Sequence, residues 1–245
     1  MKEDFANYLL LKTKNDYNLI AKDFASKRSF KAPEVMKELI FRYLKPNKNE
    51  RLLDWGCGHG RYYEILKDFD YYGLDVSENL IEIAKNKYPE AKFFVLPSFL
   101  QLPYEDNFFN HLICIDTLHH IPSKKYRELF IKEAYRVLKD NGFFILTVWN
   151  LNFFHLLWAK KLERVWLIIK AFFKKIFGLS PLDLKDVFIP WANQCDRYVH
   201  RFSKKELEKL VKNAGFQIVE SGVLKRSDTG EKDFFVVAQK IKPQQ

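Results

Sequence analysis

Three glycines follow an acid in residues 54–60, which read Asp-Trp-Gly-Cys-Gly-His-Gly. A short apolar stretch precedes this segment, and a stretch with helical spacing follows it. Because glycine has no Cβ, such a turn lets a ligand approach the backbone closely. The following helix would point free N–H groups and its positive dipole end at that ligand. The segment therefore predicts a nucleotide-type cofactor site between a strand and a helix.

A second acid, Asp75, ends the next apolar stretch of the chain. At the end of a second strand, an acid can accept hydrogen bonds from both ribose hydroxyls of an adenosine. Asp54, which precedes the glycines, would repel a phosphate group but suits a cofactor that carries an ammonium group. Together the two acids favour S-adenosylmethionine over a dinucleotide such as NAD.

Alternating apolar runs and helical patterns predict the elements that position these acids. We expect five strands in the first part of the chain, at residues 51–54, 70–75, 92–96, 108–115 and 143–149. Two more are expected at residues 216–223 and 233–240, after a helix that a capping box opens at Ser203. This pattern predicts an α/β fold with a doubly wound, seven-stranded, mostly parallel sheet, a C-terminal antiparallel strand pair and a helical insert after strand five. Residues 179–202, which contain two prolines, are expected to be irregular.

We expect a single domain, because no linker, repeat or low-complexity tract interrupts the chain. Its parts are N-terminal helices over 1–46, a cofactor-binding core over 47–150, a basic aromatic insert and substrate region over 151–202, and a terminal helix with the strand pair over 203–245.

The net charge of +10 is unevenly distributed along the 245 residues. Residues 1–50 carry +4, residues 51–150 carry −2 and residues 151–245 carry +8. The basic flanks point to a polyanionic partner, either nucleic acid or an anionic membrane, although a general lysine-rich bias would look the same. Three scattered cysteines are typical of reduced thiols in a cytoplasmic protein and predict no disulfide or metal site.

Four motifs in order resemble the class I S-adenosylmethionine-dependent methyltransferases. They are residues 54–60, Gly73-Leu74-Asp75, residues 102–110 with Leu-Pro-Tyr-Glu-Asp-Asn-Phe-Phe-Asn, and residues 136–142 with Arg-Val-Leu-Lys-Asp-Asn-Gly. The resemblance implies a Rossmann-like fold, S-adenosylmethionine as cofactor and S-adenosylhomocysteine as product. It implies these cofactor-binding residues: Asp54, Gly56, Cys57, Gly58, Gly60, Asp75, Val76, Ser98, Phe99 and Asp116. Ser98 stands where many members carry an acid that bonds the adenine amine.

Two adjacent histidines, His119 and His120, follow the fourth predicted strand. Adjacent side chains point in different directions, so the pair is a poor metal site and none is expected. Two alternatives remain for these residues: they line the pocket between cofactor and substrate, or one of them acts directly as an acid or base.

Three further segments, residues 17–28, 186–191 and 197–202, resemble the tRNA wobble-uridine methyltransferases. Those enzymes esterify the carboxymethyl group at position 5 of uridine 34, and in some lineages they need a small zinc-binding activator protein. The resemblance implies tRNA as substrate, a base stacked on Trp191, Tyr198 or Phe202 and a clamp formed by Arg197 and Arg201 on a carboxylate or on phosphates. The candidate catalytic residues are Asp116, His119, His120, Arg197, His200 and Arg201.

The insert at residues 151–178 is basic and aromatic, and its apolar runs are too short to span a bilayer. Three alternatives remain for it: peripheral contact with an anionic membrane, binding of RNA phosphates, or a lid over the pocket. The first alternative keeps a second function open, that of a membrane-associated methyltransferase acting on a lipid, a quinone or another small acceptor.

Overall fold

The computed structural model describes residues 1–151, 161–226 and 230–242. Residues 152–160, part of the predicted insert, lie outside the described residues. The helices are α1 (Glu3–Lys27), α2 (Glu34–Tyr43), α3 (Tyr63–Leu66), α4 (Glu78–Lys87), a 3-10 turn (Leu118–His120), α5 (Lys124–Val137), α7 (Leu162–Ile176) and α8 (Lys204–Asn213). The strands are β1 (Arg51–Trp55), β2 (Asp70–Asp75), β3 (Lys92–Val95), β4 (Phe109–Ile115), β5 (Leu138–Trp149), β6 (Asp186–Trp191), β7 (Cys195–His200), β8 (Gln217–Lys225) and β9 (Lys232–Gln239).

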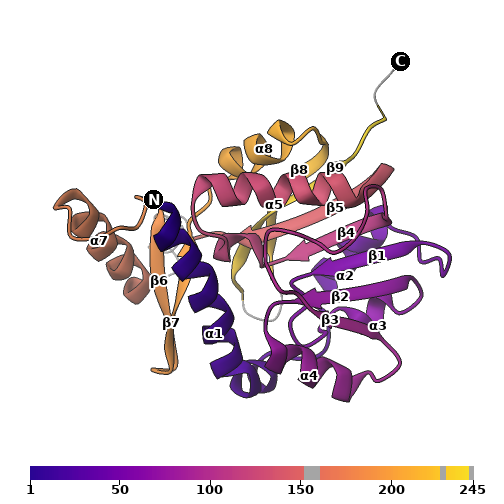
Figure 1. Ribbon diagram of the computed structural model, residues 1–245, viewed down its shortest axis with the longest axis horizontal. Helices are drawn as coiled ribbons and strands as arrows, with labels where there is room; N and C mark the ends of the chain where they lie inside the picture. Colours follow the sequence, from indigo (N-terminus) through magenta and orange to yellow (C-terminus); the bar gives the residue numbers. More distant parts are fainter. Residues whose placement is uncertain (152–160, 227–229, 243–245) are drawn as a thin grey trace.

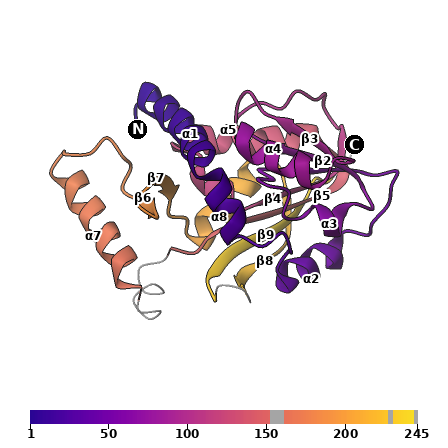
Figure 2. The ribbon, with the colours of Figure 1, turned by 90° about the horizontal axis from the view of Figure 1, so that it is seen from below.

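A seven-stranded sheet with the order β3-β2-β1-β4-β5-β9-β8 forms the centre of the molecule (Figure 1). The strands β1 to β5 run parallel, and β9 pairs antiparallel with both β5 and β8. Helices α5 and α8 contribute to the core on one face, while α2, α3 and α4 contribute to a second core cluster (Figure 2). The predicted doubly wound sheet and its C-terminal antiparallel pair are confirmed.

Strand positions agree with the sequence-based prediction to within two residues, with one exception. The strand expected at 143–149 begins at Leu138, directly after α5. Asn141 within it has a φ of +63°, and the pairing with β4 shifts register between Phe109 and His111. The predicted cap at Ser203 is also present, with its Oγ accepting a hydrogen bond from the Glu206 N–H at 3.3 Å.

The expectation of an irregular stretch at 179–202 is wrong. Strands β6 and β7 form an antiparallel hairpin there, apart from the main sheet. Alternate residues Val187, Ile189 and Val199 are buried beneath α7, which is the period-two signal of a strand. Pro190 is tolerated because it lies near the end of a two-stranded ribbon, and Ala192 and Asn193 close the turn with positive φ.

The helix expected directly after the glycine turn is much shorter than predicted. The three glycines of the turn have φ values of +85°, +56° and +80°, which no α-helix contains. The chain therefore makes successive turns before α3, which has only four residues. Consequently the backbone of the turn, rather than a long helix dipole, faces the expected ligand.

Candidate active site

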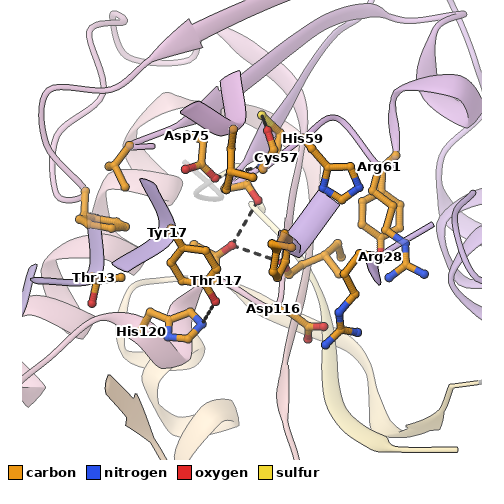
Figure 3. A pocket seen from close by; sticks show the side chains of 18 of the residues that line it. Thr13, Tyr17, Arg28, Cys57, His59, Arg61, Asp75, Asp116, Thr117 and His120 are labelled. Carbon is orange, nitrogen blue, oxygen red and sulfur yellow. Dashed lines mark hydrogen bonds between the residues drawn. The ribbon is translucent and has the colours of Figure 1, made fainter. Parts of the chain in front are cut away.

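A pocket opens over the carboxyl ends of β1, β2 and β4, where the strand order reverses (Figure 3). Ligands of open α/β sheets bind at such a reversal point. The pocket holds about 810 Å³ of empty space, measured out to its mouth, which suits a small-molecule ligand. Its walls come from the glycine turn, the ends of β2 and β4, the inner side of α1, and Arg226 beyond β8.

The glycine turn is fixed against the neighbouring strand ends. The N–H groups of Gly56 and Cys57 both donate to the Leu74 carbonyl, at 2.7 and 3.1 Å. A Cβ on Gly56 would lie 2.0 Å from the Thr117 Oγ1, so no larger residue fits there without displacing Thr117. The sequence therefore needs glycine at 56 for packing as well as for its φ.

Asp75 connects the turn to the start of α4. Its Oδ2 accepts a hydrogen bond from the Gly58 N–H and its Oδ1 one from the Ser77 N–H, each at 2.9 Å. Burial raises the pKa of Asp75, and these backbone hydrogen bonds lower it. The carboxylate lines the pocket and keeps further lone pairs for a ligand.

Asp54 lies in a different environment. It is fully buried, does not line the pocket, and accepts a hydrogen bond from the Tyr71 hydroxyl at 2.9 Å. Burial raises the pKa of Asp54 to about 7. Asp54 is therefore not among the residues that line the pocket, where the predicted contact with an ammonium group would form.

The other predicted cofactor residues divide into two groups. The residues that line the pocket are Gly56, Cys57, Gly58, Val76, Phe99 and Asp116. Gly60 and Ser98 do not line it. Ser98 is exposed, and its Oγ accepts a hydrogen bond from the Leu100 N–H at 3.1 Å. The apolar side chains of Val76 and Phe99 leave space suited to a flat, weakly polar group.

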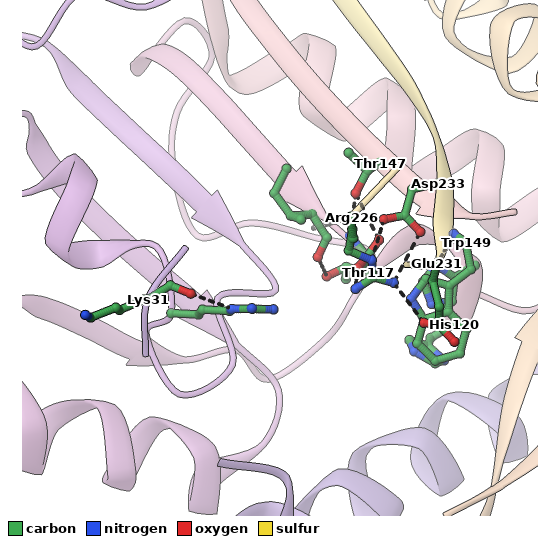
Figure 4. Close-up of polar contacts among 12 residues, drawn as sticks. Lys31, Thr117, His120, Thr147, Trp149, Arg226, Glu231 and Asp233 are labelled. Carbon is green, nitrogen blue, oxygen red and sulfur yellow. Dashed lines mark hydrogen bonds and ion pairs between the residues drawn. The ribbon is translucent and has the colours of Figure 1, made fainter. Parts of the chain in front are cut away.

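Asp116 carries a strained backbone at the end of β4, with φ of +55°. Thr147 donates to its Oδ1 at 3.0 Å, and the Arg226 guanidinium pairs with its Oδ2 at 3.1 Å (Figure 4). Arg226 also pairs with Asp233 at 2.8 Å and with Glu231 at 3.5 Å. This buried network joins the β8–β9 turn to the pocket. Sequence reasoning missed Arg226, because its partners lie far apart in the chain and follow no local spacing.

Comparison with known proteins agrees with this geometry. Residues 53–146 match the sequence family described as a methyltransferase domain. A solved S-adenosylmethionine-dependent methyltransferase from Methanosarcina mazei superposes with a TM-score of 0.67 at 24% identity, covering 83% of this chain and 97% of that one. Residues 53–146 are a methyltransferase domain.

Two curated relatives resemble the methyltransferase domain and its flanks. A tRNA (carboxymethyluridine(34)-5-O)-methyltransferase of Arabidopsis thaliana is 35% identical over 133 residues, which are 54% of this chain and 31% of that protein. An enzyme of the same name from Schizosaccharomyces pombe is 26% identical over 193 residues, covering 69% of this chain and 75% of the other. The chain thus spans about a third of the first relative and three quarters of the second.

The lining of the methyltransferase pocket fits S-adenosylmethionine. Asp75 is placed to accept hydrogen bonds from ribose hydroxyls, and Val76 and Phe99 provide apolar contact for an adenine. Arg28 also lines the pocket, and its Cζ lies 5.9 Å from the centroid of the Phe24 ring. It has no ion pair within the described part of the chain. Its guanidinium suits the carboxylate of a methionine chain. Sequence reasoning missed Arg28.

His120 lies at the inner end of the methyltransferase pocket and has both ring nitrogens engaged. Its Nδ1 lies 2.7 Å from the Tyr198 carbonyl oxygen, which can only accept, so Nδ1 carries the proton. Its Nε2 therefore accepts a hydrogen bond from the Tyr17 hydroxyl at 2.8 Å. Burial lowers the pKa of His120 to about 3. His120 is thus a neutral group that orients Tyr17, a residue of the pocket lining.

His119 is fully buried beside Trp149 and does not line the pocket. Its Nδ1 accepts a long hydrogen bond of 3.5 Å from the Trp149 N–H, while its Nε2 has no hydrogen-bond partner among the described residues. Burial lowers the pKa of His119 well below its ordinary value. The pair therefore does not act together on one ligand.

Arg197 is the third predicted group near the methyltransferase pocket. It is 4% exposed and lies between two indole rings, 5.2 Å from the centroid of Trp149 and 4.7 Å from that of Trp191. Its Nε and Nη1 have no hydrogen-bond partner in the described ranges. Arg197 does not line the pocket, but its neighbours Trp149 and Tyr17 do. Burial raises the pKa of Tyr17, and the positive charge of Arg197 partly offsets this rise.

The structure does not bring His200 and Arg201 into the methyltransferase pocket. Successive strand residues point to opposite faces, so His200 faces away from Arg197. Its Nδ1 bonds Asp186 at 2.7 Å and its Nε2 bonds Glu206 at 2.9 Å. His200 therefore ties β7 to β6 and α8.

Proposed function

We propose that the protein is an S-adenosylmethionine-dependent methyltransferase that esterifies the carboxymethyl group of a modified wobble uridine in tRNA. The pocket, the matched domain and the two tRNA-modifying relatives support this proposal. The observation that carries the choice of acceptor is the buried Arg197, whose guanidinium has donors without partners.

A buried cation with unpaired donors is costly until an anion reaches it. Trp149 and Trp191 contact the guanidinium through the faces of their rings. Such contacts do not use its N–H donors, which remain for an acceptor. A carboxylate matches that donor pattern with two parallel hydrogen bonds. An acceptor that carries a carboxylate would therefore be held beside Trp149, at the wall of the cofactor pocket.

A carboxylate acceptor also agrees with the histidines of the site. It is ionised at neutral pH, so no proton has to be removed before methyl transfer. His120 is neutral and already engaged with Tyr17, and it need not serve as a base. When bound, S-adenosylmethionine supplies an electrophilic methyl group. The task left to Arg197 and Tyr17 is to orient an acceptor oxygen, which is a matter of proximity.

Trp191 is the best-placed aromatic side chain for stacking a base of the RNA. Tyr198 and Phe202, the other two predicted candidates, are buried in the core. Trp191 is partly exposed, and its Nε1 donates to Asp23 at 2.6 Å, which fixes the ring. The charge of +8 on residues 151–245 would attract the tRNA backbone.

A small activator protein is proposed as a partner at the edge strand β3. This strand ends the sheet, and its Phe94 and Val95 are 46% and 38% exposed. Open sheet edges accept a further strand from another chain. A putative methyltransferase of Haloferax volcanii, solved in complex with the Trm112 activator, has a TM-score of 0.66 to this chain at 15% identity and covers 95% of it. Loss of activator binding by Phe94→Glu would support this edge, and unchanged binding would exclude it.

Mass spectrometry of nucleosides tests the reaction. We expect tRNA that carries carboxymethyluridine, incubated with the enzyme and labelled S-adenosylmethionine, to yield a labelled methyl ester. Arg197→Gln should reduce ester formation about a hundredfold while S-adenosylhomocysteine still binds, because the lost contact is worth about 3 kcal/mol. Arg42→Gln, which alters an exposed arginine paired with Glu220, is the matched control. Absence of the ester with wild-type enzyme, or full activity of Arg197→Gln, would refute the proposal.

A further inference from the structure

Helix α7 lies at the outer end of the molecule, beside the β6–β7 hairpin and away from the main sheet (Figure 1, Figure 2). Its buried residues Val165 and Ile168 pack on the hairpin. At its start, Lys161 and Arg164 both pair with Glu231 at 2.8 Å. One side of α7 is therefore fixed to the body of the protein, and its other side is left without a partner in the described part of the chain.

The free side of α7 is a continuous apolar stripe, which we call the α7 stripe. Its members follow the three- and four-residue spacing of one helix face and continue beyond the helix end: Leu162, Trp166, Ile169, Phe173, Ile176, Phe177 and Leu179. Trp166 is 64% exposed and Phe177 69%. Large apolar side chains clustered at this exposure mark an interaction surface.

Cations border the α7 stripe, and acids are absent from it. From Arg164 through Leu182 the sequence contains four cations, Arg164 included, and no acid. Lys170 and Lys174 are exposed and line the same shallow hollow as Trp166 and Phe173. A partner for this surface must therefore offer both an apolar region that covers these side chains and negative charges for the lysines.

We propose that the α7 stripe lies on an anionic membrane surface, with its aromatic and aliphatic side chains at the headgroup–acyl boundary and Lys170 and Lys174 at lipid phosphates. RNA would satisfy the lysines but leave the apolar side chains uncovered. A second copy of the chain would bring like charges together. At 15 residues α7 is about 22 Å long, less than the ~30 Å of a hydrocarbon core, so it lies on the bilayer. Within the described ranges, no helix is long and apolar enough to cross a membrane.

Vesicle co-sedimentation of the full chain tests this surface. We expect binding to phosphatidylcholine vesicles that contain about a third phosphatidylglycerol, weaker binding to pure phosphatidylcholine, and a decrease as salt is raised. The double variant Trp166→Glu/Phe173→Glu should lose about tenfold or more of the partitioning, because it places charge in the apolar stripe. Leu11→Glu, a change on α1 at 57% exposure, is the matched control and should bind like wild type.

Two further measurements keep the result interpretable. Circular dichroism and stabilisation by S-adenosylhomocysteine should be the same in the double variant and wild type, which separates loss of binding from loss of folding. Lys170→Gln/Lys174→Gln should remove the dependence on phosphatidylglycerol while the stripe remains. No vesicle binding by wild type, or equal binding by the double variant, overturns the proposal. Loss of tRNA binding or of a concentration-dependent dimer in the double variant, without vesicle binding, would assign the stripe to RNA or to a second copy instead.

Discussion

At the scale of single residues, Asp75 both shapes the pocket and faces it. Its two carboxylate oxygens hold the N–H groups of Gly58 and Ser77, so the side chain cannot turn away from the glycine turn. A ribose would add hydrogen bonds to a carboxylate that is already oriented, and such charge-assisted bonds contribute about 1.5–3 kcal/mol each. The residue therefore links local structure directly to cofactor affinity.

We predict that Asp75→Ala weakens S-adenosylhomocysteine binding about a hundredfold or more, since it removes the acceptor for two hydroxyls. Isothermal titration calorimetry measures the change. The control is Asp70→Ala at the other end of β2, where the carboxylate pairs with Lys92 at 2.6 Å outside the pocket. Equal affinity in Asp75→Ala and wild type would remove Asp75 from the cofactor site.

His59 shows a different effect of burial. It is 2% exposed, packs against Phe24 and Phe30, and has no hydrogen-bond partner for either ring nitrogen in the described part of the chain. Burial lowers the pKa of His59 to about 4 from an ordinary value of 6.5. Below pH 6.5 the unfolded chain therefore binds a proton that the folded chain does not. The folded state loses stability from this residue as the pH falls from 6.5 to about 4.

We predict that the free energy of unfolding of His59→Phe declines less steeply between pH 6.5 and 4.5 than that of wild type. The difference in slope should approach about 1.4 kcal/mol per pH unit, the full effect of one proton. Urea titrations at several pH values measure it. Asp54, whose pKa is raised to about 7, acts in the opposite direction in both proteins and cancels in the comparison. Parallel pH profiles would show that His59 titrates normally.

At the scale of elements, the sequence predicts those strands and helices whose residues show a clear local pattern. Strand β2 follows from its apolar run and its terminal acid, and the helix after Ser203 from its capping box. The β6–β7 hairpin was missed because Pro190 interrupts β6 and only three buried residues, Val187, Ile189 and Val199, carry its period of two. In the site, the glycines and Asp75 were found from one short segment each. Arg226 was not, because its ion pairs form only after distant strands meet.

Two serine caps differ in what they hold, and this difference gives a prediction at the element scale. Ser203 caps α8 alone, whereas Ser77 caps α4 through the Leu80 N–H at 3.2 Å and also donates to Asn18 of α1 at 2.7 Å. We expect Ser203→Ala to cost about 1 kcal/mol and Ser77→Ala about 2 kcal/mol, because the latter also loses a buried hydrogen bond. Chemical denaturation of both variants measures this order, and a reversed order would contradict the role of Ser77 as a link between helices.

At the scale of the whole molecule, α1 joins the two parts that the proposed reaction needs. On the cofactor side, the Asn18 side chain accepts hydrogen bonds from the Ser77 hydroxyl and the Asn79 N–H at the start of α4. On the hairpin side, Lys12 donates to the Asp196 carbonyl at 2.8 Å. Between these contacts Thr13 and Tyr17 line the pocket. A ligand in the pocket would therefore stabilise α1, and with it the position of Arg197 on the hairpin.

We predict that S-adenosylhomocysteine at about 100 times its dissociation constant raises the free energy of unfolding by about 2.7 kcal/mol and the melting temperature by roughly 5–10 °C. Hydrogen exchange should slow in α1 and β7 as well as in the glycine turn, because α1 contacts both β7 and the glycine turn. Asn18→Ala removes the side-chain hydrogen bonds of Asn18 to Ser77, Glu78 and Asn79 and so weakens the link to α4. It should keep the slowing in the glycine turn and reduce it in β7. If protection in wild type stays within the glycine turn and β2, α1 does not couple the cofactor to the acceptor side, and Arg197 must be positioned by the hairpin alone.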